Sequence, residues 1–318
     1  MDETAAWYAR VAGEVDGLYA EWAAGVAQDA DVLALITELP RGKRQPQLVF
    51  AVSRLLGAPE GGYADFRDRL VSNWASVAPE AEQRMTQTNE PQRCAVLLPA
   101  LSLIPGPIAL LEVGASAGLC LYPDRYSYRY RDASGAETRI DPADGPSAVV
   151  LECEVAGDVP LPTAMPEIVW RAGIDLAPLS VATERDLRWL DVSVPPEAVE
   201  RRKRARDAAA IVRADPPTLV AGDATAGLSA LAATAPAGVA LVILTAGTLV
   251  YLPRAAREAF AAEVARLGAH WLSFEAAGMV ALTGEQQAGT FVLGLDGTAL
   301  ATASPHGESI VWRSSLVE

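Results

Sequence analysis

The chain has 318 residues, of which 51% are hydrophobic, and its formal net charge at pH 7 is −14. This length is enough for one large domain or two smaller ones, each with a hydrophobic core. An acidic surface repels phosphate backbones, so nucleic acid is not an expected partner. The longest apolar runs, Cys94–Leu111 and Val239–Leu252, are broken by prolines or too short to span a bilayer, so no membrane association is expected.

The three cysteines and two histidines narrow the chemistry further. Cys94, Cys120 and Cys153 show no C-x-x-C spacing. An odd number without a disulfide framework is typical of a reducing compartment. The N-terminus begins MDE and shows no signal-like basic and apolar segments, so a cytoplasmic protein is expected. With so few histidines, no metal site is expected.

Residues 1–105 are predicted to form a helical N-terminal domain. A helical face with steps of three and four runs through Trp7, Val11, Val15, Leu18 and Trp22. Further helices are predicted at Gln47–Leu56 and Tyr63–Trp74. Nothing in this part has the alternation of a strand.

Residues 106–318 show a different pattern, in which short apolar runs alternate with helical stretches. The predicted strands are Ile108–Val113, Tyr126–Tyr130, Thr218–Ala221, Val239–Leu244 and Trp271–Glu275. Helices are predicted to begin at Gly118 and at Pro253. This alternation favours an α/β domain with a mostly parallel sheet and helical crossovers.

Two parts of this domain depart from the alternation. Asp296-Gly297 separates two apolar runs, Thr290–Leu295 and Thr298–Ala303, and predicts an antiparallel hairpin at the C-terminal end of the sheet. Residues 140–200 are rich in proline and acid and are predicted to be an insertion lying over a sheet edge.

The segment "LLEVGASAGL" at Leu110–Leu119 allows two interpretations. As G-x-S-x-G it is a nucleophile elbow, with Ser116 as the nucleophile and Asp223 and His306 downstream as partners. That elbow follows several strands and an oxyanion loop, whereas everything before Ile108 is predicted to be helical. A serine hydrolase is therefore the least favoured function.

As a glycine-rich turn after a strand, the same segment predicts a ligand site. The Glu112 carboxylate repels a pyrophosphate but suits an ammonium group. Gly114 and Gly118 let the backbone pass close to a ligand, and the helix predicted after Gly118 offers its N-terminus to a carboxylate. An amino acid moiety carries both charged groups, as in S-adenosylmethionine.

The ends of the other predicted strands supply further cofactor residues. Asp132 lies about 20 residues after Glu112, a usual spacing for a ribose-binding acid. Asp223-Ala224 closes a third strand where an adenine could be recognised, and Thr245 closes a fourth. Residues 105–318 thus resemble a class I S-adenosylmethionine-dependent methyltransferase, a Rossmann-like fold. In that family's E-x-G-x-G-x-G pattern the middle glycine is replaced here by Ser116, whose Cβ would lie near the methionine tail.

Seven segments across the chain resemble a bacterial family known only as a domain of unknown function, whose members look like methyltransferases with helices in front. They are "TQTNEPQRCAVLLPAL", "LLEVGASAGL", "DRYSYRY", "RAGIDLAPL", "LVAGDA", "GTLVYL" and "SPHGESIVW". The family usually has Asn-Leu after G-A-S-A-G-L, where this chain has Cys120-Leu121.

Polar residues near these segments are candidates for catalysis. Glu90 is a candidate base or ammonium ligand, although the segment around Asn89 also suits the start of a helix. Arg171 and Asp175 form either a structural ion pair or a grip on a substrate oxyanion and amine. His306 is either a structural group or a proton acceptor.

Substrate-binding candidates complete the site. They are Asn89, Arg93, Arg125, Tyr126 and Tyr251.

The expected function is methyl transfer from S-adenosylmethionine to a small molecule, in specialised metabolism. One alternative keeps the fold but catalyses another displacement, such as intramolecular cyclisation with loss of a leaving group. Another is a non-catalytic binding subunit, with a protein partner or a homodimer.

Overall fold

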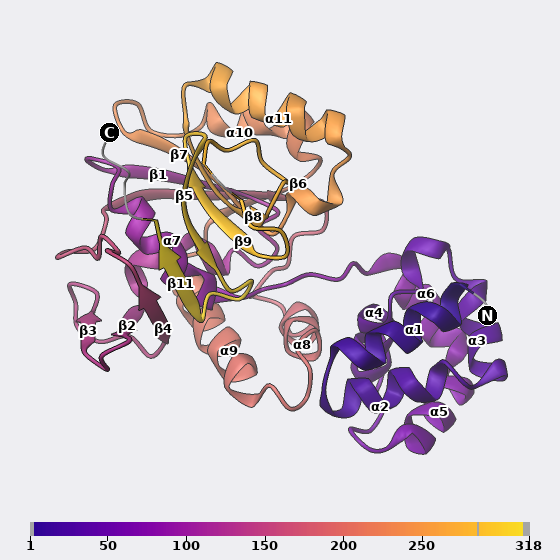
Figure 1. Cartoon of the computed structure of the whole chain (residues 1–318). Coiled ribbons are helices and arrows are strands. Elements are labelled where there is room, and N and C mark those ends of the chain that lie inside the picture. Colours follow the sequence, from indigo (N-terminus) through magenta and orange to yellow (C-terminus); the bar gives the residue numbers. More distant parts are fainter. Residues whose placement is uncertain (1–2, 285, 314–318) are drawn as a thin grey trace. The chain divides into compact units, whose positions relative to one another are not determined.

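The computed structural model describes residues 3–284 and 286–313 (Figure 1). The chain divides into two compact units. The first contains the chain up to Thr88 together with Ser180–Arg206, and the second contains Asn89–Leu179 and the chain from Asp207 onward. The first unit therefore ends earlier than the predicted boundary at residue 105, and it takes in a segment from the predicted insertion.

The first unit is helical, as the sequence predicts. Its helices are α1 (Glu3–Glu14), α2 (Gly17–Val26), α3 (Ala30–Glu38), α4 (Pro46–Leu55), α5 (Tyr63–Ser72), α6 (Trp74–Gln83) and α8 (Glu184–Val192), with a short 3-10 helix η1 (Arg41–Lys43). The helical face predicted through residues 7–22 does not belong to one helix. α1 ends at Glu14 and α2 begins at Gly17, which has a φ of +68°. Aromatic side chains form the core of this unit, with Trp22 stacked on Phe66 at 4.3 Å between ring centroids.

A buried arginine explains why residues 180–206 belong to the helical unit. Arg54 Nη1 donates hydrogen bonds to the carbonyl oxygens of Val192 at 2.8 Å and Val194 at 2.6 Å. Its Nη2 pairs with Glu60 at 2.7 Å. The guanidinium thus satisfies the carbonyls at the end of α8, and losing it would leave buried acceptors unpaired.

The second unit contains one 11-stranded sheet among the described residues. Its strands are β1 (Ile108–Val113), β2 (Ser127–Asp132), β3 (Glu137–Ile140), β4 (Val150–Ala156), β5 (Ile168–Asp175), β6 (Thr218–Ala221), β7 (Ala240–Ala246), β8 (His270–Ala276), β9 (Phe291–Leu295), β10 (Thr298–Ala303) and β11 (Ser309–Trp312). The helices are α7 (Cys94–Leu101), α10 (Ala224–Ala232) and α11 (Arg254–Leu267), with four 3-10 helices: η2 (Pro91–Arg93), η3 (Leu119–Leu121), η4 (Pro123–Arg125) and η5 (Leu249–Tyr251). Residues of α9 (Val199–Ala214) fall in both units.

The strands lie in the order β3-β2-β4-β11-β10-β9-β8-β7-β1-β5-β6. The stretch β8-β7-β1-β5-β6 is entirely parallel. Read from β6 to β8 and numbered by their order in the chain, these five strands have the order 3-2-1-4-5, as in doubly wound sheets. The direction of chain progress reverses between β1 and β7, and ligands bind outside the carboxyl ends of the strands at such a switch point. The predicted hairpin is confirmed, because β9 and β10 pair antiparallel across Asp296-Gly297. It does not form an edge of the sheet, because β11, β4, β2 and β3 continue the sheet beyond β10.

One prediction about the sheet is wrong, and the place of a second strand affects the predicted ribose-binding acid Asp132. The segment at residues 140–200 is not an insertion over an edge, because it supplies β4 and also β5, which pairs with β1. The strand that ends at Asp132 does not neighbour β1. It is β2, which pairs with β3 and β4 near the opposite edge. Alternation identifies a strand locally, whereas its neighbour in the sheet depends on distant contacts.

Alternation along β1 and β5 decides which side chains lie together. Leu111 and Val113 share a hydrophobic core with Ile174 and with apolar side chains of α10 and α11. Glu112 and Asp175 are next to these residues in sequence, so they point to the opposite face of the sheet. None of the described helices is both long and apolar enough to cross a membrane.

Candidate functional site

The turn after β1 is tight, and its conformation requires glycine at Gly114. Gly114 has a φ of +76°, and a Cβ there would lie 2.3 Å from Thr248 Oγ1. The helix predicted to begin at Gly118 is wrong, because only the short η3 and η4 follow. The turn therefore provides no helix N-terminus for a carboxylate, and any ligand here would bind through side chains and single backbone groups.

Ser116 occupies a backbone conformation that normally favours glycine, with a φ of +48°. Such a conformation costs about 1–2 kcal/mol for a residue with a Cβ. Two hydrogen bonds hold it in place: its N–H donates to Asp175 Oδ2 at 2.9 Å, and its carbonyl accepts from Leu179 N at 3.0 Å. The buried Ser116 Oγ has no hydrogen-bond partner within the described part of the chain.

Asn89 connects a second segment to this turn. Its side-chain Oδ1 accepts a hydrogen bond from Ala117 N at 3.0 Å, and Asn89 is itself buried. Contrary to what its position suggests, Asn89 does not cap a helix. The N-cap of η2 is Glu90, whose side chain accepts a hydrogen bond from Gln92 N at 3.1 Å. The amide nitrogen of Asn89 finds no partner among the residues that the structure describes.

Glu112 is a buried carboxyl at the centre of this arrangement, only 5% exposed. Its Oε2 atom lacks a hydrogen-bond partner in residues 3–284 and 286–313. Burial raises the pKa of Glu112 well above its usual range, and negative charge on Cys120 and Asp175 adds to the rise. The guanidinium of Arg93 opposes it.

Arg93 is a buried cation, 7% exposed, at the carboxyl edge of the sheet. Its Nη1 donates to Ala246 O at 2.7 Å, and its Nε donates to Pro305 O at 3.1 Å. Gly247 leaves room for it, because a Cβ there would lie 3.0 Å from Nη2. In the part of the chain that the structure describes, no carboxylate oxygen lies within 4.0 Å of this guanidinium. Anionic ligands are the natural partners of such a group.

Glu275, at the end of β8, is a buried acid that the sequence interpretation did not select. Its two oxygens accept hydrogen bonds from Thr248 N at 3.0 Å and Leu249 N at 3.2 Å. Burial raises its pKa to about 7. Glu275 therefore holds the turn after β7 in place. The sequence feature that could have identified Glu275 is its position as an acid at the end of the predicted strand Trp271–Glu275.

Thr245 belongs to this supporting structure. Its Oγ1 accepts a hydrogen bond from Trp271 Nε1 at 3.3 Å and also bonds Glu275. These hydrogen bonds join β7 to β8, and a cofactor contact of Thr245 stays a prediction.

Arg171 and Asp175 do not pair with each other, contrary to one of the two predictions for them. Arg171 Nη2 pairs with Asp124 at 2.7 Å, its Nη1 donates to Leu121 O at 2.7 Å, and its guanidinium stacks over Tyr122 at 4.8 Å. These contacts make Arg171 structural. Asp175 instead supports the turn after β1.

Three other predicted residues make contacts of their own with neighbouring protein groups. Asp132 lies near the far edge of the sheet and caps its own turn, accepting from Ser134 N at 2.8 Å. Tyr126 is buried and donates to Leu119 O at 2.7 Å. Arg125 pairs with Asp124 at 3.5 Å.

The remaining predicted residues follow strands of the sheet. Asp223 is exposed and caps α10 by accepting from Thr225 N at 2.8 Å, with Ala224 beginning the helix. Tyr251 is 67% exposed after β7. His306 lies between β10 and β11 beside Gly307, whose carbonyl accepts from Gln92 Nε2 at 3.1 Å. This hydrogen bond places the loop of His306 next to the segment of Arg93.

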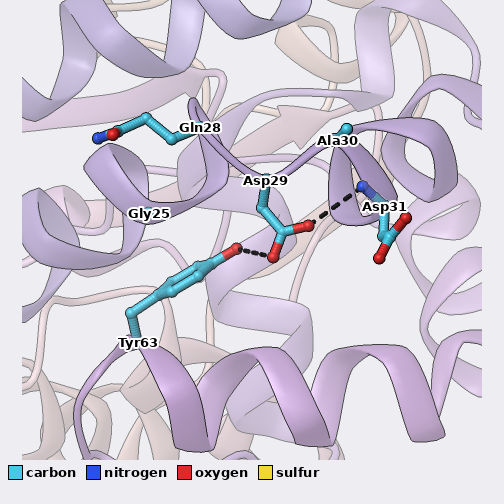
Figure 2. A pocket seen from close by; sticks show the side chains of 6 residues that line it. All are labelled: Gly25, Gln28, Asp29, Ala30, Asp31 and Tyr63. Atoms are coloured by element: carbon cyan, nitrogen blue, oxygen red, sulfur yellow. Dashed lines mark hydrogen bonds between the residues drawn. The ribbon is translucent and has the colours of Figure 1, made fainter.

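The helical unit has a hollow of about 460 Å³, lined by Gly25, Gln28, Asp29, Ala30, Asp31 and Tyr63 (Figure 2). Its polar groups satisfy one another. Asp29 accepts from Tyr63 Oη and from Asp31 N, both at 3.1 Å, and pairs with Arg67 at 2.6 Å. The hollow therefore has the features of a structural network, and we place the candidate site at the turn after β1.

Comparison with known families gives one match. A family model described as "Uncharacterized protein conserved in bacteria (DUF2332)" matches residues 2–312. The chain belongs to this family. This confirms the resemblance to a bacterial family of unknown function. Neither the curated proteins nor the solved structures gave a match.

Two of the segments that resemble the family meet at the candidate site of this family member. "TQTNEPQRCAVLLPAL" supplies Asn89 and Arg93, and "LLEVGASAGL" supplies Glu112 and Ser116. The hydrogen bond from Ala117 to Asn89 joins them.

Proposed function

We propose that this protein is a small-molecule enzyme that binds S-adenosylmethionine at the turn after β1 and transfers its methyl group to a small metabolite. The observation that carries the proposal is the set of buried polar atoms without partners in the described chain: Glu112 Oε2, Asn89 Nδ2 and Ser116 Oγ. Each costs about 1–3 kcal/mol when left unsatisfied. A bound ligand that completes these hydrogen bonds accounts for them.

The chemistry of these atoms fits the amino acid end of the cofactor. Glu112 offers an acceptor to an ammonium group, while the Asn89 amide offers a donor to a carboxylate oxygen. Arg93 adds a buried positive charge whose guanidinium has no ion pair within the described residues. Strand order supports the same location, because β1 lies at the switch point of the parallel sheet.

Acids at the ends of the next two strands are candidates for the nucleoside. Asp175 ends β5, which pairs with β1, and Asp223 follows β6, which pairs with β5, so both lie at the carboxyl edge of the parallel strands. Asp175 takes the ribose role that the sequence suggested for Asp132. Its carboxylate already accepts hydrogen bonds from Ser116 N and Ala177 N.

When bound, S-adenosylmethionine supplies a methyl group activated by a sulfonium. In-line displacement at that carbon requires alignment and exclusion of water more than covalent help from the protein. Glu112 and Asn89 would hold the ligand in register. Glu90 and His306 are the candidates to accept a proton from a hydroxyl or amine substrate.

Calorimetric titration of the full chain with S-adenosylmethionine and S-adenosylhomocysteine tests the proposal. We expect both to bind, and Glu112→Gln to weaken binding by about 10-fold or more, because a charge-assisted hydrogen bond is lost. Glu258→Gln, on the exposed surface of α11, is the matched control and should leave affinity unchanged. Absence of binding to the wild-type protein would refute the proposed function.

A second candidate reaction keeps the ligand but not the methyl transfer. Ser116 has a left-handed backbone and an unpartnered Oγ in the described structure, and a 3-10 turn follows instead of a helix. These departures favour a different displacement, such as ring closure within the amino acid part with loss of the thioether. Mass spectrometry distinguishes the two: ring closure releases methylthioadenosine without any acceptor, whereas methyl transfer leaves S-adenosylhomocysteine.

A further inference from the structure

Two of the three cysteines meet beside the turn after β1. Cys94 begins α7, and Cys120 lies in η3. The Cys94 thiol donates to the carbonyl oxygen of Cys120 at 3.8 Å, and each of the two thiols shifts the pKa of the other, as neighbouring side chains do. Cys120 Sγ in turn donates to Glu90 O at 3.5 Å. The two cysteines thus lie next to each other and beside the segment of Glu90.

The third cysteine lies elsewhere in the sheet. Cys153 is on β4, and its thiol donates to Glu154 O at 3.6 Å. Burial raises its pKa to about 12. Cys153 therefore serves as an internal control, because it is buried like the pair but contacts neither of the other two thiols among the described residues.

The environment makes the two paired thiols unequal. The neighbouring Cys94 side chain and the positive charge of Arg93 lower the pKa of Cys120, whereas burial raises the pKa of Cys94. Cys120 is also 6% exposed, while Cys94 is 0% exposed. The thiolate is the reactive form of cysteine, so Cys120 is the residue that meets an oxidant first.

We propose that Cys94 and Cys120 form a modification site, at which a hydroperoxide oxidises the two thiols to an intramolecular disulfide. The Cys120 thiolate attacks one oxygen of hydrogen peroxide and the O–O bond breaks. This gives a sulfenic acid, and the departing hydroxide takes up a proton to form water. Cys94 then attacks the Cys120 sulfur, the S–S bond forms, and the S–O bond breaks with loss of a second water. Two thiols and one peroxide give one disulfide and two waters, with sulfur oxidised and peroxide reduced.

The disulfide would act directly on the candidate site. It removes the thiol that donates to Glu90 O and ties the start of α7 to the turn after β1. The segment carrying Asn89 and Arg93 leads into Cys94, so the bond restricts the part of the site that has to adjust around a ligand. This inference does not depend on the identity of that ligand.

Peptide mapping of the wild-type full chain tests the proposal. The protein is treated with hydrogen peroxide, alkylated after denaturation, digested without reductant and analysed by mass spectrometry. We expect the Cys94 and Cys120 peptides to be joined, with a mass lower by two hydrogen atoms, and Cys153 to be alkylated. Both cysteines alkylated after treatment, or a disulfide that includes Cys153, would overturn the proposal.

Single substitutions separate the two steps. Cys94→Ser should accumulate a Cys120 sulfenic acid that dimedone traps, because the resolving thiol is missing, whereas Cys120→Ser should give neither adduct nor disulfide. Cys153→Ser is the matched control and should form the disulfide as the wild type does. Phenylarsine oxide, which bridges neighbouring thiols, should bind the untreated wild type and protect both cysteines from alkylation. Failure of the wild-type protein to bind it would contradict the thiol contact without any substitution.

Discussion

Binding of an ammonium-bearing ligand to Glu112 should release a proton from the protein. Burial, reinforced by Cys120 and Asp175, raises the pKa of this carboxyl well above its usual range in the free protein. The free protein therefore holds a proton there in weakly acidic solution. A bound ammonium favours the carboxylate, so the proton leaves when the ligand binds.

The sign and size of the effect follow from this linkage. Below the pKa of Glu112 in the free protein, each bound ligand should displace up to one proton. Affinity should then rise with pH by up to about tenfold per unit, equivalent to about 1.4 kcal/mol. The rise should stop once the pH exceeds the pKa of the free protein. Measurements between about pH 5.5 and pH 7 keep the α-amino group of the ligand charged.

Calorimetry with S-adenosylhomocysteine in two buffers of different ionisation enthalpy measures the released proton. The observed binding enthalpy should differ between buffers for the wild type and for Glu258→Gln, and should not differ for Glu112→Gln. The same enthalpy in both buffers for the wild type would refute the role of Glu112, as would an affinity that stays flat with pH. Proton release that persists in Glu112→Gln would refute it too.

Three further predictions test the supporting structure. Between pH 4.5 and about 7 the folded protein holds a proton on Glu275 that the unfolded chain loses. The free energy of unfolding should therefore fall by about 3 kcal/mol as pH rises through this window. In urea unfolding, Glu275→Gln should abolish that part of the pH dependence. Gly173→Ala would place a Cβ 2.4 Å from that of Ala115, and should cost about 1–3 kcal/mol and weaken ligand binding. Asp175→Asn should weaken S-adenosylhomocysteine binding, whereas Asp132→Asn, near the far edge of the sheet, should not.

Controls for these variants come from the same unit. Gly222→Ala is matched to Gly173→Ala, because a Cβ at Gly222 would lie 3.8 Å from its nearest neighbour, Ile174 Cδ1, and should unfold at nearly the wild-type urea concentration. Equal losses for the two alanine variants would contradict the packing explanation. A loss of affinity in Asp132→Asn equal to that in Asp175→Asn would contradict the assignment from strand order.

The elements of the fold could be predicted from local pattern. The bounds predicted for β1 and β6 are those of the structure, because each is a short apolar run next to turn residues. Strand partners could not be predicted in this way. β2 follows β1 in the chain but lies near the opposite edge, while β5, from a stretch without clear alternation, pairs with β1. Burial along β5 is irregular, which explains the weak signal.

The residues of the candidate site that lie in the turn after β1 could be predicted from the sequence. Glu112 and Gly114 could be selected because an acid and a glycine follow a predicted strand. The support of Ser116 by Asp175 joins residues 59 positions apart, and spacing alone does not reveal such a contact. An ion pair of Arg171 with Asp175 in its own segment was one of two predicted alternatives, but Arg171 pairs with Asp124, 47 positions away.

A crystal structure of the full chain with S-adenosylhomocysteine is the most direct test of the proposed site. We expect ligand density at the carboxyl edge of β1, with the ammonium group within hydrogen-bond distance of Glu112 Oε2 and the carboxylate near Asn89 Nδ2. Ligand bound elsewhere on the protein, or crystals that take up no ligand, would contradict the proposed cofactor and its place in the fold.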